Sequence, residues 1–136
     1  MTVKKTILCV DDELSLSIAK LMLETRGYRV MTCKTALEAL DCVRRSTVDL
    51  VLSNLELPDA SATDLVRQIK SRAPQLPVIL LSDHRRVFHT DAPADLLLRK
   101  ETFAPAELLE SIRVLLTKRR GPRREPALIE SQAQAS

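Results

Sequence analysis

Short apolar runs alternate with helical patterns along this 136-residue chain, and this alternation limits the fold more than any other feature. Each run is continuous, as in a parallel strand that is covered on both faces. Between the runs, apolar side chains recur with the spacing of an amphipathic helix. The alternation predicts an α/β fold with a doubly wound parallel sheet and right-handed connections. The expected strands are 7–10, 28–33, 50–53, 78–81 and 95–98, and the expected helices are 14–26, 35–45, 61–71 and 106–117, with 84–92 polar and at most a short helix.

The helical segments carry boundary signals and apolar faces. Gly27 is expected to end the first helix as a left-handed cap, and Thr35 and Ser61 have the spacing of N-terminal caps. Leu16 and Leu23 fall outside the apolar stripe expected for the first helix. The side chains expected to face the core are Leu14, Ile18, Leu21, Met22, Leu37, Leu40, Val43, Leu65, Val66, Ile69, Leu108, Leu109, Ile112, Leu115 and Leu116.

Composition separates a folded domain, residues 1–118, from a basic tail, residues 119–136. Hydrophobic residues make up 45% of the chain and aromatic residues 2%, so the core must be aliphatic. The net charge of +3 depends on five cations near the C-terminus, without which the chain carries about −2. The folded part is therefore not expected to bind nucleic acid, and the tail is expected to be disordered. The five cations are Lys118, Arg119, Arg120, Arg123 and Arg124.

The three cysteines give no metal or redox motif. Cys9 and Cys33 lie in apolar runs, where cysteine acts as a small hydrophobic residue, and Cys42 forms no CxxC pair with either of them. No apolar run approaches the ~20 residues that span a bilayer. The N-terminus also lacks a signal-peptide pattern, so a cytoplasmic location is expected.

Polar side chains follow the expected strands. Asp11 and Asp12 come after the first strand, Asn54 after the third, Ser82 after the fourth and Lys100 soon after the fifth. Ligands of doubly wound sheets bind at the carboxyl ends of the strands. The pattern indicates a cation or phosphate site that has one carboxylate fewer than the chemistry would use.

A simpler interpretation stays open for each of these residues. The acidic pair would cap the helix that follows it, Ser82 would be a strand-end hydroxyl and Lys100 would be a surface lysine. His84 and His89 have no ligand spacing and are expected at the surface.

Four sequence blocks, in this order, resemble the receiver domains of response regulators in two-component signalling. The resemblance covers about residues 5–117 and implies a flavodoxin-like receiver fold with five strands in the order 2-1-3-4-5. The blocks are Ile7-Leu8-Cys9-Val10-Asp11-Asp12-Glu13, the stretch from Asp49 to Asp59, Pro77-Val78-Ile79-Leu80-Leu81-Ser82, and Ala94-Asp95 with Lys100.

The resemblance also implies roles for the strand-end residues. In the family, a histidine kinase phosphorylates an aspartate at the end of the third strand, an acidic pair holds Mg²⁺, and a hydroxyl and a lysine contact the phosphoryl oxygens. By position, Asp11 and Asp12 match the acidic pair, Ser82 the hydroxyl and Lys100 the lysine. The acceptor position is Asn54, and a neutral amide oxygen is a poor nucleophile. Phosphorylation at this position is therefore not expected.

Other departures from the family pattern point the same way. A hard cation loses an anionic ligand at the acceptor position, so Mg²⁺ binding is expected to be weak even if Glu56 contributes a carboxylate, and no cofactor is required. Leu97 stands at an aromatic switch position, Glu101 replaces a frequent proline, and Ala62 replaces a usual glycine. The span 82–100 is about four residues shorter than usual, which implies a fourth helix shortened by roughly one turn.

The sequence thus predicts a stand-alone, non-enzymatic signalling module of phosphorelay systems that works through protein contacts without phosphorylation. The expected partners are a histidine kinase, another signalling protein, or a second copy that binds through the face formed by 84–92, 95–98 and 106–117.

Two other functions remain open. One is a conventional phospho-accepting regulator that uses Glu56, Asp59 or a deamidated Asn54. The other is a nucleic-acid-associated protein that acts through its basic tail, with binding that depends steeply on salt.

Overall fold

The computed structural model describes residues 4–82, 94–99 and 105–118. Strands and helices alternate through these residues, and each of their bounds lies within one residue of the bound expected from sequence. The segment 84–92 lies outside the described residues, so the shortened fourth helix stays a prediction. The elements are β1 (Thr6–Val10), α1 (Glu13–Thr25), β2 (Arg29–Cys33), α2 (Ala36–Arg45), β3 (Leu50–Asn54), α3 (Ala62–Arg72), β4 (Val78–Ser82), β5 (Leu96–Arg99) and α4 (Pro105–Lys118).

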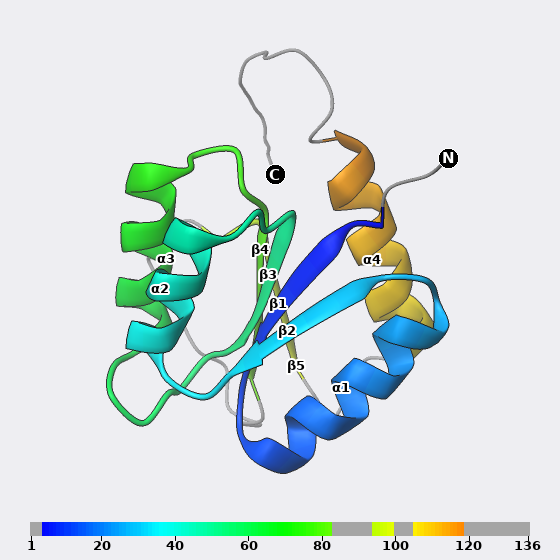
Figure 1. The fold of residues 1–136 in the computed structure, drawn as a ribbon, viewed down its shortest axis with the longest axis horizontal. Coiled ribbons are helices and arrows are strands. Elements are labelled where there is room, and N and C mark those ends of the chain that lie inside the picture. Colours follow the sequence, from blue (N-terminus) through cyan, green and yellow to red (C-terminus); the bar gives the residue numbers. More distant parts are fainter. Residues whose placement is uncertain (1–3, 83–93, 100–104, 119–136) are drawn as a thin grey trace.

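The described strands form one parallel sheet in the order β2-β1-β3-β4-β5 (Figure 1). β1 pairs with β2 on one side and with β3 on the other. The prediction of a parallel α/β fold is therefore confirmed. The strand order reverses between β1 and β3, which makes the carboxyl ends of these two strands the expected place for a binding site.

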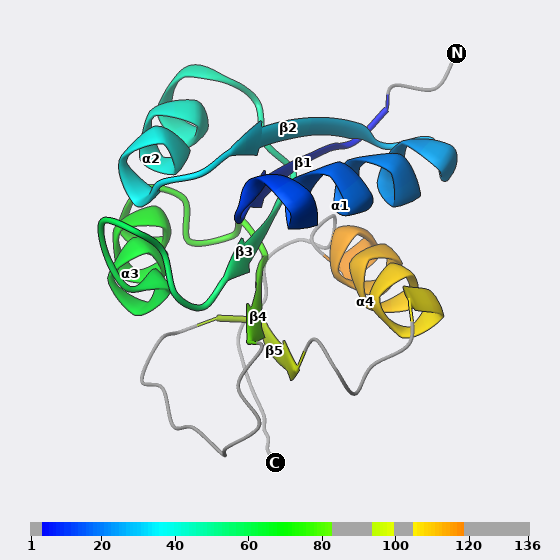
Figure 2. The ribbon, with the colours of Figure 1, turned by 90° about the horizontal axis from the view of Figure 1, so that it is seen from below.

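Helices cover both faces of the sheet (Figures 1 and 2). α2 and α3 pack on one face and α1 and α4 on the other. Because successive strand residues point to opposite faces, Leu8 and Val10 enter the first core and Ile7 and Cys9 enter the second. No helix in this described part of the chain is long and apolar enough to cross a membrane.

Helix α1 is rotated relative to the sequence prediction. Leu14, Ile18 and Leu21 were expected in the core, but they are 72%, 61% and 72% exposed. Leu16 and Leu23 are buried instead. Apolar residues occupy two sides of this helix, and both sets satisfy helical spacing. Spacing alone therefore could not decide which side packs against the sheet.

Helix α2 gives a second correction. Leu37 was expected to be buried and is 73% exposed, whereas Ala36 and Ala39 are buried. These two small residues form the buried part of α2, and they leave the larger leucine in solvent. The prediction for α3 is confirmed, because its buried residues include Leu65, Val66 and Ile69.

The caps expected from sequence are present. Thr35 accepts a hydrogen bond from the Glu38 backbone N–H, and Ser61 accepts one from the Asp64 backbone N–H. Gly27 has φ of 92°, the left-handed conformation that glycine adopts without strain after a helix.

Candidate functional site

The carboxyl end of β1 carries two carboxylates with different surroundings. Asp11 is 8% exposed, and its Oδ1 accepts a hydrogen bond of 2.7 Å from the Asp12 backbone N–H. Asp12 is the N-cap of α1, and its Oδ1 accepts a hydrogen bond of 2.8 Å from the Ser15 backbone N–H. Asp12 therefore caps α1, as the simpler interpretation expected, and its role as a metal ligand stays a prediction.

The carboxyl end of β3 carries the amide. Asn54 is the last residue of the strand, and its Nδ2 donates a hydrogen bond of 2.7 Å to the Glu56 carbonyl oxygen. Its Oδ1 is buried and has no hydrogen-bond partner among the described residues. An unpaired buried acceptor costs about 1–3 kcal/mol. One hydrogen bond therefore holds the Asn54 side chain, and its unpaired Oδ1 lowers the stability of the folded protein.

These strand ends meet around one hollow of about 350 Å³, here named the acidic hollow. It brings together four of the site residues predicted from sequence, which are Asp11, Asp12, Asn54 and Glu56. Four carboxylates and one ammonium group lie along it, so the hollow is acidic. It is lined by Asp11, Asp12, Glu13, Lys34, Asn54, Glu56, Leu57 and Pro58.

The other predicted site residues lie at the neighbouring strands or outside the described part. Ser82 ends β4 and is 1% exposed. It follows Leu81, which pairs with Asn54, so its backbone is next to the acceptor position. Leu97, in β5, pairs with Leu80 of the neighbouring strand β4. The residues that lie outside the described part are His84, His89, Lys100, Glu101 and the tail 119–136.

An ion pair at the rim was not predicted from sequence. Lys34 Nζ lies 2.9 Å from Glu13 Oε1, and this hydrogen bond and charge raise the pKa of Lys34. Both side chains are largely exposed, so the pair contributes little to stability. Lys34 directly follows the last residue of β2, and the reasoning applied to the other strand ends would have found it.

Asp59 has a structural role that sequence did not indicate. Its carboxylate accepts hydrogen bonds of 2.8 and 3.1 Å from the backbone N–H groups of Ala36 and Leu37, at the start of α2. These bonds lower the pKa of Asp59, with the bond from Ala36 as the largest cause. Asp59, one of the alternative phosphate acceptors, therefore links the loop after β3 to the start of α2.

The arrangement does not fit the Mg²⁺ ion that the family implies. Within residues 4–82, 94–99 and 105–118, no group of three or more His, Cys, Asp or Glu side chains is placed to hold a metal ion. Mg²⁺ requires near-octahedral oxygen ligands, usually including carboxylates. Asp11 and Asp12 each direct one oxygen to a backbone N–H, and Asn54 supplies no charge.

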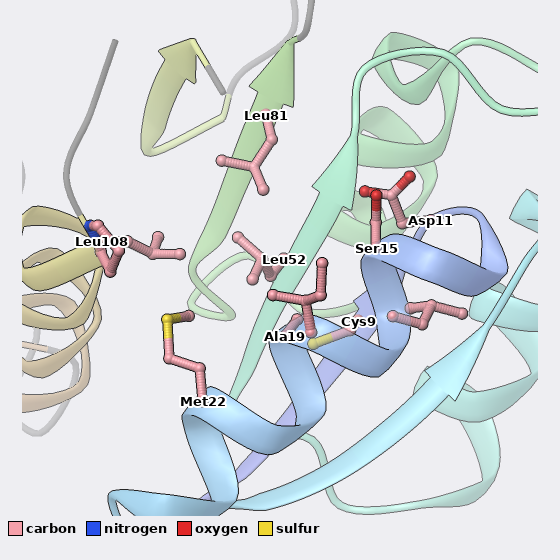
Figure 3. A pocket seen from close by; sticks show the side chains of 11 residues that line it. Cys9, Asp11, Ser15, Ala19, Met22, Leu52, Leu81 and Leu108 are labelled. Atoms are coloured by element: carbon pink, nitrogen blue, oxygen red, sulfur yellow. The ribbon is translucent and has the colours of Figure 1, made fainter. Parts of the chain in front are cut away.

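A second hollow, the apolar groove, runs between α1 and α4 (Figure 3). Its volume is about 310 Å³, and Asp11 and Ser15 lie at its polar end. Because Asp11 lines both hollows, the groove begins where the acidic hollow ends. The other labelled lining residues are Cys9, Ala19, Met22, Leu52, Leu81 and Leu108.

The chain is thus an α/β domain with a doubly wound parallel sheet and a polar site where the strand order reverses. That site has an acidic pair after β1, a polar residue at the end of β3 and a buried serine at the end of β4. Residues 7–113 match the response regulator receiver domain family, and the chain belongs to that family. Receiver domains of this family act in two-component signalling and interact with histidine kinases and other signalling proteins.

Curated relatives are longer than this chain. Response regulator MprA of Mycobacterium leprae is 35% identical over 115 residues, which cover 81% of this chain and 50% of the relative. Transcriptional regulatory protein ZraR of Klebsiella oxytoca is 33% identical over 82 residues, which cover 60% of this chain and 18% of the relative. The chain thus spans half or less of these relatives.

Solved structures show the same flavodoxin-like, CheY-like fold. A CheY-like receiver domain from Methanospirillum hungatei JF-1 has a TM-score of 0.77 and 30% identity, over 86% of this chain and 97% of that chain. The response regulator TrrA of Thermotoga maritima, in complex with Mg²⁺-BeF, has a TM-score of 0.74 and 30% identity, over 82% of this chain and 98% of that chain.

Proposed function

We propose that this receiver domain is a degenerate one that transmits signals in a phosphorelay through protein contacts that do not depend on its own phosphorylation. The observation that carries the proposal is the position of Asn54, at the end of β3 and beside the acidic pair in the acidic hollow. An acyl phosphate forms when a carboxylate oxygen attacks phosphorus. The amide oxygen of Asn54 carries no negative charge, and the nitrogen lone pair is delocalised, so this chemistry has no nucleophile here. The domain is accordingly proposed to be non-enzymatic and to need no cofactor.

The surroundings of Asn54 support this proposal. Its Nδ2 is engaged by the Glu56 carbonyl oxygen, and the Asp59 carboxylate is engaged by the first turn of α2. Asp59 would have to give up two backbone hydrogen bonds to react with a phosphodonor. Of the two alternative acceptor acids, Glu56 is the one that lines the acidic hollow with Asn54, and it is the acceptor that an experiment must exclude.

An exposed apolar stripe gives such contacts a surface. Leu14, Ile18 and Leu21 are spaced along one side of α1, and each is more than half exposed. Exposed apolar clusters on a folded domain are typical of interaction sites. The proposed partner is a histidine kinase or another signalling protein, with a second copy of this chain as an alternative partner.

The test is intact-mass spectrometry after incubation with a small acyl phosphate and Mg²⁺. The native chain should gain no phosphate, Asn54→Asp should gain one, and Asn54→Ala should match the native chain. A phosphate on the native chain would contradict the proposal. Peptide mapping would then assign it to Glu56, to Asp59 or to a deamidated Asn54.

A further inference from the structure

A further hollow, here named the basic hollow, lies at the amino ends of the strands. Its volume is about 440 Å³. Thr6 begins β1, Arg29 begins β2 and Asp49 directly precedes β3, so this hollow and the acidic hollow lie at opposite edges of the sheet. It is lined by Lys4, Lys5, Thr6, Arg29, Met31, Ser46, Thr47 and Asp49.

Backbone hydrogen bonds fix the frame of the basic hollow. The Arg29 backbone N–H donates to the Lys5 carbonyl oxygen at 2.9 Å. The Asp49 backbone N–H donates to the Thr6 carbonyl oxygen at 2.8 Å. Thr6 and Arg29 are register partners, and their side chains point to the face of the sheet on which Met31 packs, the face that α2 and α3 cover. The frame therefore depends on main-chain contacts, which alanine at position 5 or 29 would keep.

The charges of the basic hollow are not balanced. Lys4, Lys5 and Arg29 are exposed and bring three positive charges, and Asp49 brings one negative charge, which leaves a net charge of +2. The Asp49 carboxylate accepts a hydrogen bond of 2.8 Å from the Thr6 backbone N–H. In the part of the chain that the structure describes, none of the three cations forms an ion pair. An anion is therefore the ligand that this hollow favours.

We propose that the basic hollow binds a small organic phosphate, specifically a phosphate monoester. Lysine and arginine side chains bind phosphate oxygens, and the hydroxyl groups of Ser46 and Thr47 can donate to the same oxygens. A phosphate monoester carries about −1.5 to −2 charges at pH 7, which matches the net charge of the hollow.

The size and lining of the hollow favour an ester over a bare phosphate ion. The volume of about 440 Å³ lies within the range of small-molecule sites, roughly 300–1,000 Å³. Met31 provides an apolar wall, against which the organic group of the ester would lie. The cations and hydroxyls would bind the phosphate, and Met31 would contact the remainder of the molecule.

The experiment titrates the full native chain with phenyl phosphate at fixed ionic strength and follows backbone N–H groups and methionine methyl groups by NMR. Saturable shifts are expected at the N–H groups of Lys5, Arg29 and Thr47, and the ring should shift the Met31 methyl. The Met22 methyl is the matched control, because Met22 lines the apolar groove on the other face of the sheet and should not shift (Figure 3).

Two other anions separate the contributions of charge and organic group. Inorganic phosphate should shift the same N–H groups with lower affinity and should move the Met31 methyl less. Phenyl sulfate has the same ring and one negative charge, and it should bind at least about fivefold more weakly than phenyl phosphate. Equal affinity for the phosphate and sulfate esters would overturn the assignment to a phosphate.

A pair of double variants separates the hollow from general attraction by a positive surface. Lys5→Ala with Arg29→Ala should weaken binding at least about tenfold. Lys20→Ala with Arg67→Ala removes the same charge from exposed positions on α1 and α3 outside the hollow, and it should bind like the native chain.

Three results would overturn the proposal. They are equal losses in the two double variants, shifts that do not saturate, and shifts that centre on the acidic hollow or move the Met22 methyl. The comparison of the two methyl groups uses the native chain, so it does not depend on the folding of a variant. The site is remote from position 54, and the outcome is independent of phosphorylation there.

Discussion

β1 and β3 are neighbours in the sheet, yet β1 ends in two carboxylates and β3 ends in an amide. At the β1 end, Asp12 caps α1 and Asp11 holds the Asp12 backbone N–H. At the β3 end, Asn54 holds one carbonyl oxygen and leaves its own Oδ1 without a partner. The carboxylates thus have structural partners of their own, and the amide is only half satisfied.

This difference shows why an acidic pair is a poor sign of chemistry by itself. A residue that caps a helix has a structural role whether or not the site carries out a reaction. In the proposed function, the residue at the β3 end decides whether phosphorylation can occur, because it stands at the position where the family forms the covalent bond. The presence of Asp11 and Asp12 is therefore compatible with the proposed absence of phosphorylation.

The largest expected effect concerns the helix on which the β1 end is built. Leu23 is fully buried in α1, and Leu23→Ala should lower the free energy of unfolding by about 2–5 kcal/mol. Leu21→Ala, at a position 72% exposed, should change it by less than about 0.5 kcal/mol. Urea denaturation measures both. Equal losses would mean that α1 does not pack on the sheet through the side that carries Leu23.

Restoring the carboxylate at the β3 end should make the two strand ends alike. Asn54→Asp adds an anion beside Asp11 and Asp12, and it should raise the affinity for Mg²⁺ at least about tenfold, or about 1.4 kcal/mol. Isothermal titration calorimetry compares the variant with the native chain. If the two affinities agree, the acidic hollow has lost more than one ligand.

The structural role of the β1 end can be separated from its charge. Asp12→Ala removes the cap of α1 and should destabilise the protein by about 1 kcal/mol. Asp12→Asn keeps a capping oxygen, removes the charge, and should cost less. Thermal unfolding of the two variants compares them. An equal loss for the two variants would show that the charge of Asp12, and not its capping oxygen, stabilises the helix.

The smallest effect concerns the loop that follows the β3 end. The pKa of Asp59 is lowered in the folded protein, so its contribution to stability is present above 3.8 and is lost as pH falls through the lowered value. Asp59→Ala should melt at a lower temperature than the native chain near neutral pH, and the difference should fade in acid. Asp59→Asn, which cannot ionise, should itself lack this pH dependence. A native-minus-variant difference that stays constant with pH would rule out a role for the charge.

Sequence could predict what depends on spacing and chain direction. The strand ends come together because parallel strands place their carboxyl ends on one edge, and Asp11, Asp12 and Asn54 follow from that rule. Rotation of a helix depends on which of two apolar sides packs, and spacing did not settle this for α1, where Leu16 and Leu23 are buried in place of Leu14, Ile18 and Leu21. In α3, only one side is apolar, and the prediction succeeded.

Contacts between distant side chains and backbones were beyond the sequence. Asp59 looked like a turn residue after Pro58, because the helix that it caps lies 23 residues earlier.

The cap formed by Asp59 closes the backbone from Ala36 through β3 into a ring. Both hydrogen bonds at the start of α2 must break before the loop after Asn54 can separate from the first turn of this helix. Leu37 donates its backbone N–H to this clasp while its side chain stands 73% exposed. A partner protein that displaced the Leu37 backbone would therefore also displace the loop that borders the acidic hollow, since Asp59 joins the two.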